Sequence, residues 1–335
     1  MDERLRFDTS IDPIATYHIP LVYELIRNSI SLSRLKRALS SIIDKHKVLR
    51  TRLSFDENLG ELQQEILDCV SPHMIVTQMK SDDDLHKILY DEETNVNIFN
   101  LNEGKVFRCH VVRRSTSIDE DVVAVSDILV FNFHHIAFDG ASIDIFFEDL
   151  ERAYCSDGVL EKCGFDYIDY SIHEREISLE ESKIFWKEHL DGFLNTFLPL
   201  PYDRSPAENK TRSGYGITVK SKLSSDVVNH ILTFMKEHCV TLHQIGLTAF
   251  YTFLFKLTQQ TDLTVLTVTA NRHRAELENM IGIFVNTLPQ RIIIQPHRNF
   301  LSLVKDVKDV VLSTLSHAHV PFQDIGSNTT NMAHL

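Results

Sequence analysis

The chain lacks the local patterns by which metal, disulfide and phosphate sites are usually found. Its five cysteines are an odd number without C-x-x-C spacing, which favours reduced thiols over a disulfide framework or a zinc site. No metal-ligand spacing, glycine-rich phosphate loop or internal repeat occurs along the 335 residues. We therefore expect no metal and no cofactor bound by the protein itself. The cysteines are Cys69, Cys109, Cys155, Cys163 and Cys239.

Basic residues are outnumbered, and long apolar runs are absent. The net charge of −13 argues against the broad basic surface that nucleic-acid binding requires. The apolar runs at 246–257 and 283–294 are too short and too interrupted to span a bilayer. The N-terminus, MDERLRFD, has no apolar core of a signal peptide. These features predict a cytoplasmic protein with neither a nucleic-acid nor a membrane partner.

Length and composition predict a folded protein with two lobes. A hydrophobic content of 43% with only 11 glycines and 9 prolines is typical of globular proteins, and 335 residues exceed one ordinary core. The best boundary is the proline-rich stretch LPLPYDRSP at 198–206. We expect a first lobe at 1–178 with a core of its own, a helix and linker at 179–213, and a second lobe at 214–335.

Hydrophobic periodicity predicts strands and helices in both lobes. The first lobe has predicted strands at 21–27, 61–67 and 105–113, a helix capped by Ser31 or Ser33, a helix at 82–93 and a hairpin turn at 57–60. After a helix at 179–190, the second lobe has predicted strands at 216–223, 262–270 and 283–294 and helices from 224, at 241–257 and at 300–318.

The stretch 127–154 carries the most specific pattern. An apolar run at 128–133 predicts a buried strand, and two histidines, His134 and His135, follow it directly. Asp139 and Gly140 mark a turn, and a helix follows. The apolar face of that helix consists of Ile143, Phe146, Phe147, Leu150, Ala153 and Tyr154.

The two histidines are expected to have different roles. Successive strand residues point to opposite faces, so one imidazole packs inward and the other faces a cavity. Asp139 lies in the turn, where it can hold a cationic partner. Gly140 allows either the close approach of a ligand or a backbone with positive φ. A core histidine pair is the ordinary alternative, but the spacing of all four residues favours a functional site.

Residues 134–140, HHIAFDG, resemble the HHxxxDG motif of the condensation domains of nonribosomal peptide synthetases. Other acyltransferases of the same fold share this motif, so further matches matter. MIGIFVNTLPQR at 280–291 resembles the family's IGxFVNTLPxR, and KHKVLRTRL at 45–53 resembles RHExLRTxF. The segments at 165–173 and 317–325 resemble YxDYAxW and HxxxPFxxL. The motifs occur in the family's order along essentially the whole chain.

The resemblance implies an α/β fold of two chloramphenicol-acetyltransferase-like lobes in a V, with mixed sheets flanked by helices. It implies amide bond formation between a carrier-bound acyl or peptidyl thioester and an aminoacyl acceptor. The substrates would arrive on the phosphopantetheine arms of peptidyl or acyl carrier proteins, with an adenylation domain adjacent in a full synthetase.

The resemblance also implies roles for particular residues. His135 would be the catalytic residue, as a general base or as an electrostatic positioner, and His134 would be buried and structural. Asp139 would pair with Arg50 and hold the loop, and Gly140 would admit the substrate. Two residues of the second lobe, Asn286 and Arg291, would line the channel between the lobes.

The chain departs from the family pattern in several places. Lys45 replaces the first Arg of RHExLRTxF and is expected to be a solvated helix end, and His173 replaces the Trp of YxDYAxW. The family's opening motif and its final strands have no counterpart, so we expect an incomplete second lobe. Such a lobe should expose apolar surface beside the strand at 283–294 and the helix at 300–318.

Two other functions remain open at this point. A related acyltransferase would move acyl groups from CoA to alcohols or amines, but the motif at 280–291 favours condensation. A non-catalytic module would dock carrier proteins without turnover, which the missing opening motif and final strands favour together with the departures at Lys45 and His173.

Overall fold

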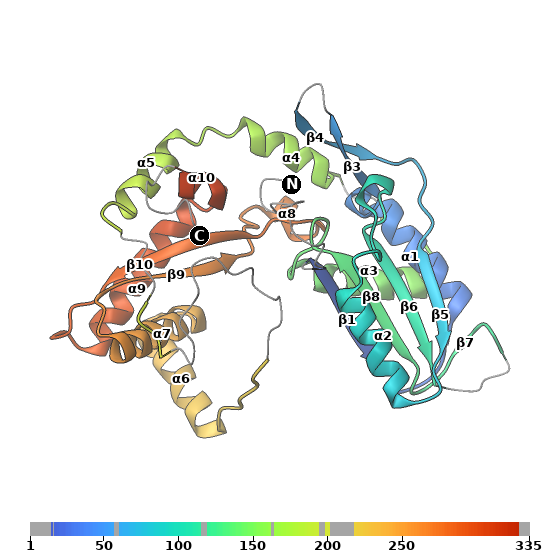
Figure 1. The fold of residues 1–335 in the computed structure, drawn as a ribbon, viewed down its shortest axis with the longest axis horizontal. Helices are drawn as coiled ribbons and strands as arrows, with labels where there is room; N and C mark the ends of the chain where they lie inside the picture. The colour runs from blue at the N-terminus through green and yellow to red at the C-terminus, as the bar shows by residue number, and fades with distance from the viewer. Residues whose placement is uncertain are drawn as a thin grey trace. The chain divides into compact units, whose positions relative to one another are not determined.

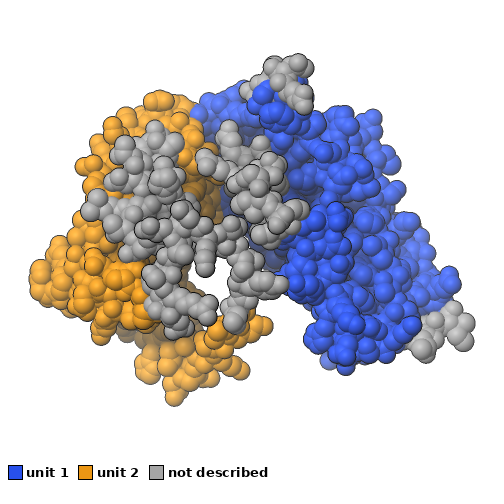
Figure 2. Space-filling view, viewed as in Figure 1, with its two compact units in different colours: residues 1–177, 272–285 blue, residues 178–271, 286–335 orange. Residues whose placement is uncertain are grey.

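A computed structural model describes residues 15, 17–56, 60–114, 119–161, 164–193, 198–201 and 218–327. The chain divides into two compact units (Figure 2). Unit 1 is Met1–Ile177 with Arg272–Val285, and unit 2 is Ser178–Asn271 with Asn286–Leu335. The first division lies beside the predicted end of the first lobe. The assignment of all of 214–335 to the second lobe is wrong, because Arg272–Val285, here called the crossing segment, packs into unit 1.

Unit 1 is built on a four-stranded mixed sheet in the order β1-β8-β6-β5 (Figure 1). The strand β8 pairs antiparallel with β1 and β6, whereas β5 and β6 are parallel. This mixed sheet with helices confirms the predicted α/β class. The strands are β1 (His18–Glu24), β5 (His73–Gln78), β6 (Phe107–Arg113) and β8 (Ile128–His134).

The side chains of β8 alternate between two hydrophobic clusters, one on each face of the sheet. Leu129, Phe131 and Phe133 belong to the larger cluster, which includes α1 (Leu32–Lys45) and α3 (Ser142–Cys155). Ile128 and Val130 belong to the smaller cluster, which includes α2 (Asp82–Thr94). By the same alternation, the next residues toward α2 are polar ones, Asn132 and His134.

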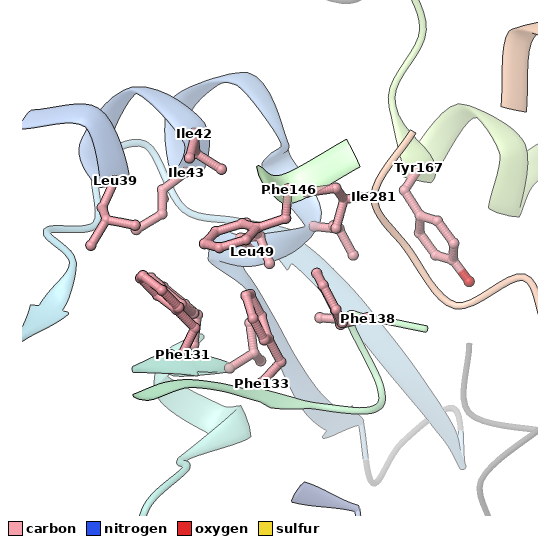
Figure 3. Close-up of a cluster of buried hydrophobic side chains, with 14 of the residues drawn as sticks. Leu39, Ile42, Ile43, Leu49, Phe131, Phe133, Phe138, Phe146, Tyr167 and Ile281 are labelled. Carbon is pink, nitrogen blue, oxygen red and sulfur yellow. The ribbon is translucent and has the colours of Figure 1, made fainter. Parts of the chain in front are cut away.

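The larger cluster is the core of unit 1, and Figure 3 shows its centre. The helix α1 begins at the N-cap Ser31, the first of the two predicted candidates, and buries the apolar stripe that the sequence shows. Phe133 stacks on Phe138 with ring centroids 3.8 Å apart, and Phe146 of α3 meets Phe133 edge-on at 5.0 Å. The α1 residues in the core are Leu35, Ala38, Leu39, Ile42 and Ile43.

The crossing segment supplies part of this same core. Its residues Leu277, Met280, Ile281, Ile283 and Phe284 are all buried there. The predicted self-sufficient core of the first lobe is therefore wrong, because residues about 100 positions beyond the end of that lobe complete it.

Gly282 allows the crossing segment to lie against α4 (Tyr167–Glu176). A Cβ atom at this position would lie 2.1 Å from Cδ2 of Tyr167, far inside van der Waals contact. Tyr167 also donates a hydrogen bond to the carbonyl of Ile283 at 2.8 Å. The glycine of this motif is thus required by packing.

Smaller elements complete unit 1 as the structure describes it. Two-stranded sheets join β2 (Ile30–Ser31) to β7 (Val122–Val123) and β3 (Thr51–Asp56) to β4 (Glu61–Ile66). The last pair confirms the predicted second strand of the hairpin, whose turn at 57–59 lies outside the described residues. The crossing segment contains one helical turn, α8 (Ala275–Glu278).

Unit 2 has an antiparallel pair of strands, β9 (Asp262–Thr269) and β10 (Asn286–Ile293). The helices α7 (Leu242–Thr258) and α9 (Phe300–Ser316) share its hydrophobic core, and α7 begins with the predicted capping box of Thr241 and Gln244. The remaining described helices are α5 (Glu180–His189), α6 (Ser225–His238) and α10 (Phe322–Ser327).

The predicted strand at 216–223 is wrong over its described residues, 218–223, which are irregular and exposed. Lys220 and Lys222 are exposed to solvent and pack on no other element. A strand that pairs with no neighbour is not stable in water. Large apolar side chains are exposed on β9, β10 and α9; they include Leu266, Val268, Ile293, Leu312 and Leu315. Within the described residues, no helix has the length and apolarity to cross a membrane.

Candidate active site

The end of β8 is held from both sides by backbone hydrogen bonds. The N–H of His134 donates to the carbonyl of Val106, just before β6, at 2.8 Å. The N–H of His135 donates to the carbonyl of Tyr17, just before β1, also at 2.8 Å. The backbone of the histidine pair is therefore fixed to both neighbouring strands.

His134 is a buried, neutral imidazole. It is 7% exposed, and its Nδ1 accepts a hydrogen bond from the backbone N–H of Ile136 at 3.2 Å. The neutral ring therefore carries its proton on Nε2. Burial lowers the pKa of His134 to about 4, and the nearby His18 and His135 act in the same direction. Near neutral pH this side chain carries no charge.

His135 differs from its neighbour in both burial and bonding. Its side chain is partly exposed, and no described residue hydrogen-bonds to its imidazole. The Nδ1 atom is buried, so Nε2 is the nitrogen that a substrate group can reach. The strand alternation predicts this contrast between the two imidazoles. An unbonded, accessible imidazole nitrogen can accept or donate a proton.

Asp139 links the histidine loop to α3 and to the crossing segment. Its side chain is completely buried, and its two oxygens accept four hydrogen bonds. Two come from Ser142, from the backbone N–H at 2.9 Å and from the hydroxyl at 2.7 Å. The others come from Arg272 at 2.9 Å and from the backbone N–H of Phe284 at 3.0 Å.

Arg272 is itself fixed by several contacts. Its side chain is 7% exposed and donates to the carbonyls of Leu277 at 2.6 Å and Met280 at 2.5 Å. The guanidinium also lies over the ring of Phe284, 4.1 Å from the centroid. The Asp139–Arg272 pair is thus buried and hydrogen-bonded on both sides, which is the condition under which a buried ion pair is retained.

The predicted pairing of Asp139 with Arg50 is wrong. Arg50 lies at the end of the short helix Lys47–Arg50 and donates to the carbonyl of Leu67, beyond β4. The Asp139 oxygens are occupied by donors from α3 and the crossing segment. Arg272 lies 133 residues after Asp139, so local sequence could not identify it as the partner.

The basic cluster before β3 also differs from expectation. Lys45 is not a solvated helix end, because its amine lies 2.7 Å from the carboxylate of Asp149 on α3. His46 bonds the other oxygen of Asp149 at 2.6 Å. Burial lowers the pKa of His46, and Asp149 opposes that shift. Lys45 therefore makes a buried ion pair at the position where the family has Arg.

Gly140 is exposed and has neither of the features that usually demand glycine. Its φ is outside the left-handed region, and a Cβ would meet nothing within 4 Å. Of the two alternatives for this glycine, the structure therefore excludes the positive φ. The close approach of a ligand remains a prediction.

Asn286 and Arg291 make structural contacts within unit 2, and their channel-lining role stays a prediction. The amide of Asn286 is buried and donates to the carbonyls of Ala318 at 2.7 Å and Val320 at 2.6 Å. The guanidinium of Arg291 pairs with Asp262 at 2.8 Å. Both side chains donate hydrogen bonds to acceptors in unit 2, and so connect β10 to the elements beside it.

Comparison with known proteins identifies the family. The family model described as the condensation domain matches residues 5–334. The chain belongs to the condensation-domain family. Among curated proteins, this condensation domain is 30% identical over 315 residues to surfactin synthase subunit 2 of Bacillus subtilis (strain 168), covering 92% of the chain and 8% of that protein. It is 27% identical over 321 residues to bacitracin synthase 1 of Bacillus licheniformis, covering 92% of the chain and 6% of that protein. It thus spans less than a tenth of either relative.

Solved structures share the fold of this condensation domain. The X-domain from teicoplanin biosynthesis has a TM-score of 0.76 at 23% identity, over 93% of this chain and 71% of that one. The first condensation domain of the calcium-dependent antibiotic synthetase, in complex with a substrate analogue, has a TM-score of 0.70 at 17% identity, over 95% and 73%. A four-domain nonribosomal peptide synthetase, holo-AB3403, matches at 0.75 and 20%, over 94% and 23%.

Among the described residues of the condensation domain, no group of three or more side chains that could hold a metal ion occurs.

Sequence reasoning missed the role of Arg272, although its position shortly before the IGxFVNTLPxR segment was a signal. It also missed Glu92, a buried carboxylate near His134.

Proposed function

We propose that this condensation domain forms an amide bond between a carrier-bound acyl or peptidyl thioester and an aminoacyl acceptor, in nonribosomal peptide synthesis. Membership of the family supports the reaction class. The observation that supports it most at the level of residues is the contrast between the two motif histidines. One is buried, neutral and bonded, and the other has an accessible, unbonded Nε2.

In the proposed reaction the acceptor amine attacks the thioester carbon. The C–N bond forms, the C–S bond breaks, and the electron pair of that bond leaves on the thiol sulfur. The amine loses one proton to Nε2 of His135, which returns it to the leaving thiolate. In the alternative form of the same proposal, His135 stays neutral and positions the amine by a hydrogen bond. No covalent intermediate on the enzyme is required in either case.

The remaining motif residues support this role indirectly. Asp139 and Arg272 hold the loop that carries His135 against α3 and the crossing segment. Gly140 has no side chain and open space around its Cα, so a substrate can pass close to the backbone. These assignments predict a rigid loop with one accessible imidazole.

The partners follow from the same proposal. Donor and acceptor would be held on phosphopantetheine arms of peptidyl or acyl carrier proteins, and the domain would bind no cofactor of its own. The similar fold within a four-domain synthetase supports an adenylation domain nearby in the same assembly. We place the reaction in the cytoplasm.

The first departure from the family pattern does not favour a non-catalytic module. Lys45 pairs with the buried carboxylate of Asp149 at 2.7 Å, so this lysine links α1 to α3. Loss of turnover therefore needs support other than Lys45.

The test is an amide-formation assay with carrier-loaded donor and acceptor, in which product is measured by mass spectrometry. His135→Ala should lower turnover roughly 10²- to 10⁴-fold, because it removes the proton-accepting group. His173→Ala is the matched control: it removes an exposed histidine of the same unit and should leave turnover unchanged.

Full turnover by the His135 variant would contradict the proposal. Acyl transfer from CoA, with none from a carrier, would favour the CoA-dependent acyltransferase. Carrier binding without any product from the unchanged protein would favour the docking module.

A further inference from the structure

A buried polar layer lies between α2 and the unit 1 sheet, directly beside His134. At its centre is Glu92, in the last turn of α2, whose side chain is 1% exposed. We define the polar layer as Glu92 with the four side chains that bond to it: His18, Arg108, His110 and Asn132.

Glu92 bonds to three different strands. Its carboxylate is 2.5 Å from the guanidinium of Arg108 and 2.6 Å from Nδ1 of His110, both on β6. Asn132 of β8 donates to the carboxylate at 2.9 Å and to the Glu92 carbonyl at 2.7 Å. Nδ1 of His18, on β1, lies 3.3 Å from the same carbonyl.

The polar layer reaches the histidine motif through strand register. Asn132 is two residues before His134 and lies on the same face of β8, opposite Arg108 of β6. His18 is the direct cross-strand partner of His134, and their ring centroids are 6.4 Å apart. Phe99 meets both imidazoles edge-on, at 4.7 Å and 5.7 Å. His134 is therefore the last member of one continuous packed group.

The interface between α2 and the sheet is polar only at this end. Further along, the same helix packs Leu85, Ile88 and Leu89 on Val112, Ile128 and Val130. A buried ion pair is usually no more stable than apolar residues of similar size. The layer also leaves Nε of Arg108 buried without a partner among the described residues. Stability of the interface alone would therefore favour apolar side chains here, as it does at the other end.

We propose that Glu92 is a positioning residue for the HHxxxDG motif, because it bonds to β1, β6 and β8 where they support His134. By fixing these strand ends against α2, it holds the His134 side chain in one orientation. The backbone of the adjacent His135 is thereby held in place as well. Hydrogen-bonded groups with several directional partners restrict geometry in a way that apolar contacts do not. The inference rests on the proposed function for its catalytic consequence but not for its structural one.

The structural consequence is tested by imidazole NMR on the full chain. In the unchanged protein His134 should show a single tautomer, with the proton on Nε2, because Nδ1 accepts from Ile136. In Glu92→Gln, which keeps the shape of the side chain and removes its charge, the His134 signals should average between tautomers and those of His135 should shift. Asn132→Ala should do the same, since it breaks only the link to β8.

Asp149→Asn is the matched control. It removes a buried carboxylate of the same unit that also bonds a histidine and a basic side chain, on the opposite side of the sheet. It should leave the His134 and His135 signals unchanged. Folded Glu92→Gln and Asn132→Ala proteins with unchanged signals would overturn the proposal. Equal changes in Asp149→Asn would also overturn it, because the effect would then be a general loss of packing.

Kinetics provide the second measurement. Glu92→Gln should lower kcat about 10- to 100-fold and leave KM for both carrier substrates unchanged, because misplacement of a catalytic group slows the chemical step. A rise in KM with unchanged kcat would contradict positioning. If the unchanged protein forms no amide, the proposed function fails, and the NMR result alone decides whether Glu92 positions the motif.

Discussion

Two regions of unit 1 are each organised by one buried carboxylate, and they stabilise different things. Asp139 joins the histidine loop to a crossing segment more than 130 residues away, whereas Glu92 joins the end of α2 to three adjacent strands. Asp139 joins two parts of unit 1 that are distant in the sequence. Glu92 fixes strands that are already neighbours in the sheet. The same chemistry thus produces long-range assembly in one region and local precision in the other.

The largest effect that distinguishes the two regions is expected at Asp139. Asp139→Asn leaves Arg272 buried without its counter-charge and should cost about 3–5 kcal/mol of unfolding free energy. Arg272→Met should cost a similar amount, and the double variant should show strong coupling. The measurement is hydrogen exchange of unit 1 amides against denaturant, because the single tryptophan, Trp186, lies in unit 2.

Arg50→Met is the control for that cycle. Arg50 bonds to the carbonyl of Leu67 and not to Asp139, so its effect should add to that of Asp139→Asn within about 0.5 kcal/mol. Coupling between Asp139 and Arg50, with additivity between Asp139 and Arg272, would reverse the assignment of partners.

Acid should affect Glu92 and the neighbouring His134 over two different pH ranges. Burial raises the pKa of Glu92, but the bonds from His110, Arg108 and Asn132 outweigh it and lower that pKa from 4.5 to about 2. The stability from the charged carboxylate is therefore present above pH 4.5 and lost as the pH falls toward 2. Burial lowers the pKa of His134 from 6.5 to about 4, so the unfolded chain takes up a proton that the folded chain does not. Stability then falls between pH 6.5 and 4.

Glu92 and His134 should each contribute about 3 kcal/mol to the pH dependence of the unfolding free energy. The pKa of each differs by about 2.5 between the folded and the unfolded chain, and a difference of one in pKa corresponds to about 1.36 kcal/mol. Unfolding free energies across pH 2–8 would measure them by difference between proteins, which removes the other titrating groups. Glu92→Gln should flatten chiefly the lower range and His134→Phe chiefly the upper one. A Glu92 variant with the unchanged slope below pH 4.5 would show that this carboxylate is not held in its charged form.

The smallest effects are expected at two motif glycines. Gly282→Ala places a methyl group against Tyr167 and should cost about 1–3 kcal/mol through overpacking. Gly140→Ala meets nothing and should change stability by less than about 0.5 kcal/mol, while lowering amide formation if a substrate passes there. Melting temperatures and turnover of both variants separate the two roles. A large loss of stability at Gly140 would assign it to the fold.

Much of unit 1 could be predicted because its signals are local. The strand β8, the helix α3 and the Ser31 cap each follow from periodicity or capping within a few residues. The contrast between His134 and His135 follows from strand alternation alone. The strand β5 was not predicted, because it lies at the edge of the sheet and is half exposed, so its apolar pattern is weak.

The partners of buried charges could not be predicted, because they depend on contacts between distant residues. Arg50 matches a motif and lies in a plausible place, yet the chain brings Arg272 to Asp139 instead. Glu92 looks like an ordinary acid in a polar helix, and only the packing of α2 on three strands shows that it is buried. Asn286 and Arg291 likewise have roles that depend on which elements meet β10.

The crossing segment has a consequence for the order in which a ribosome delivers the protein. Asp139 leaves the ribosome 133 residues before Arg272 and 145 before Phe284. At about 5–20 residues per second, this gap lasts on the order of ten seconds. During that time the nascent chain has the HHxxxDG loop but not the residues that complete its core. Cotranslational folding should therefore leave the histidine loop without its Asp139 partners until the crossing segment has been made, so that the HHxxxDG loop is synthesised first and ordered later.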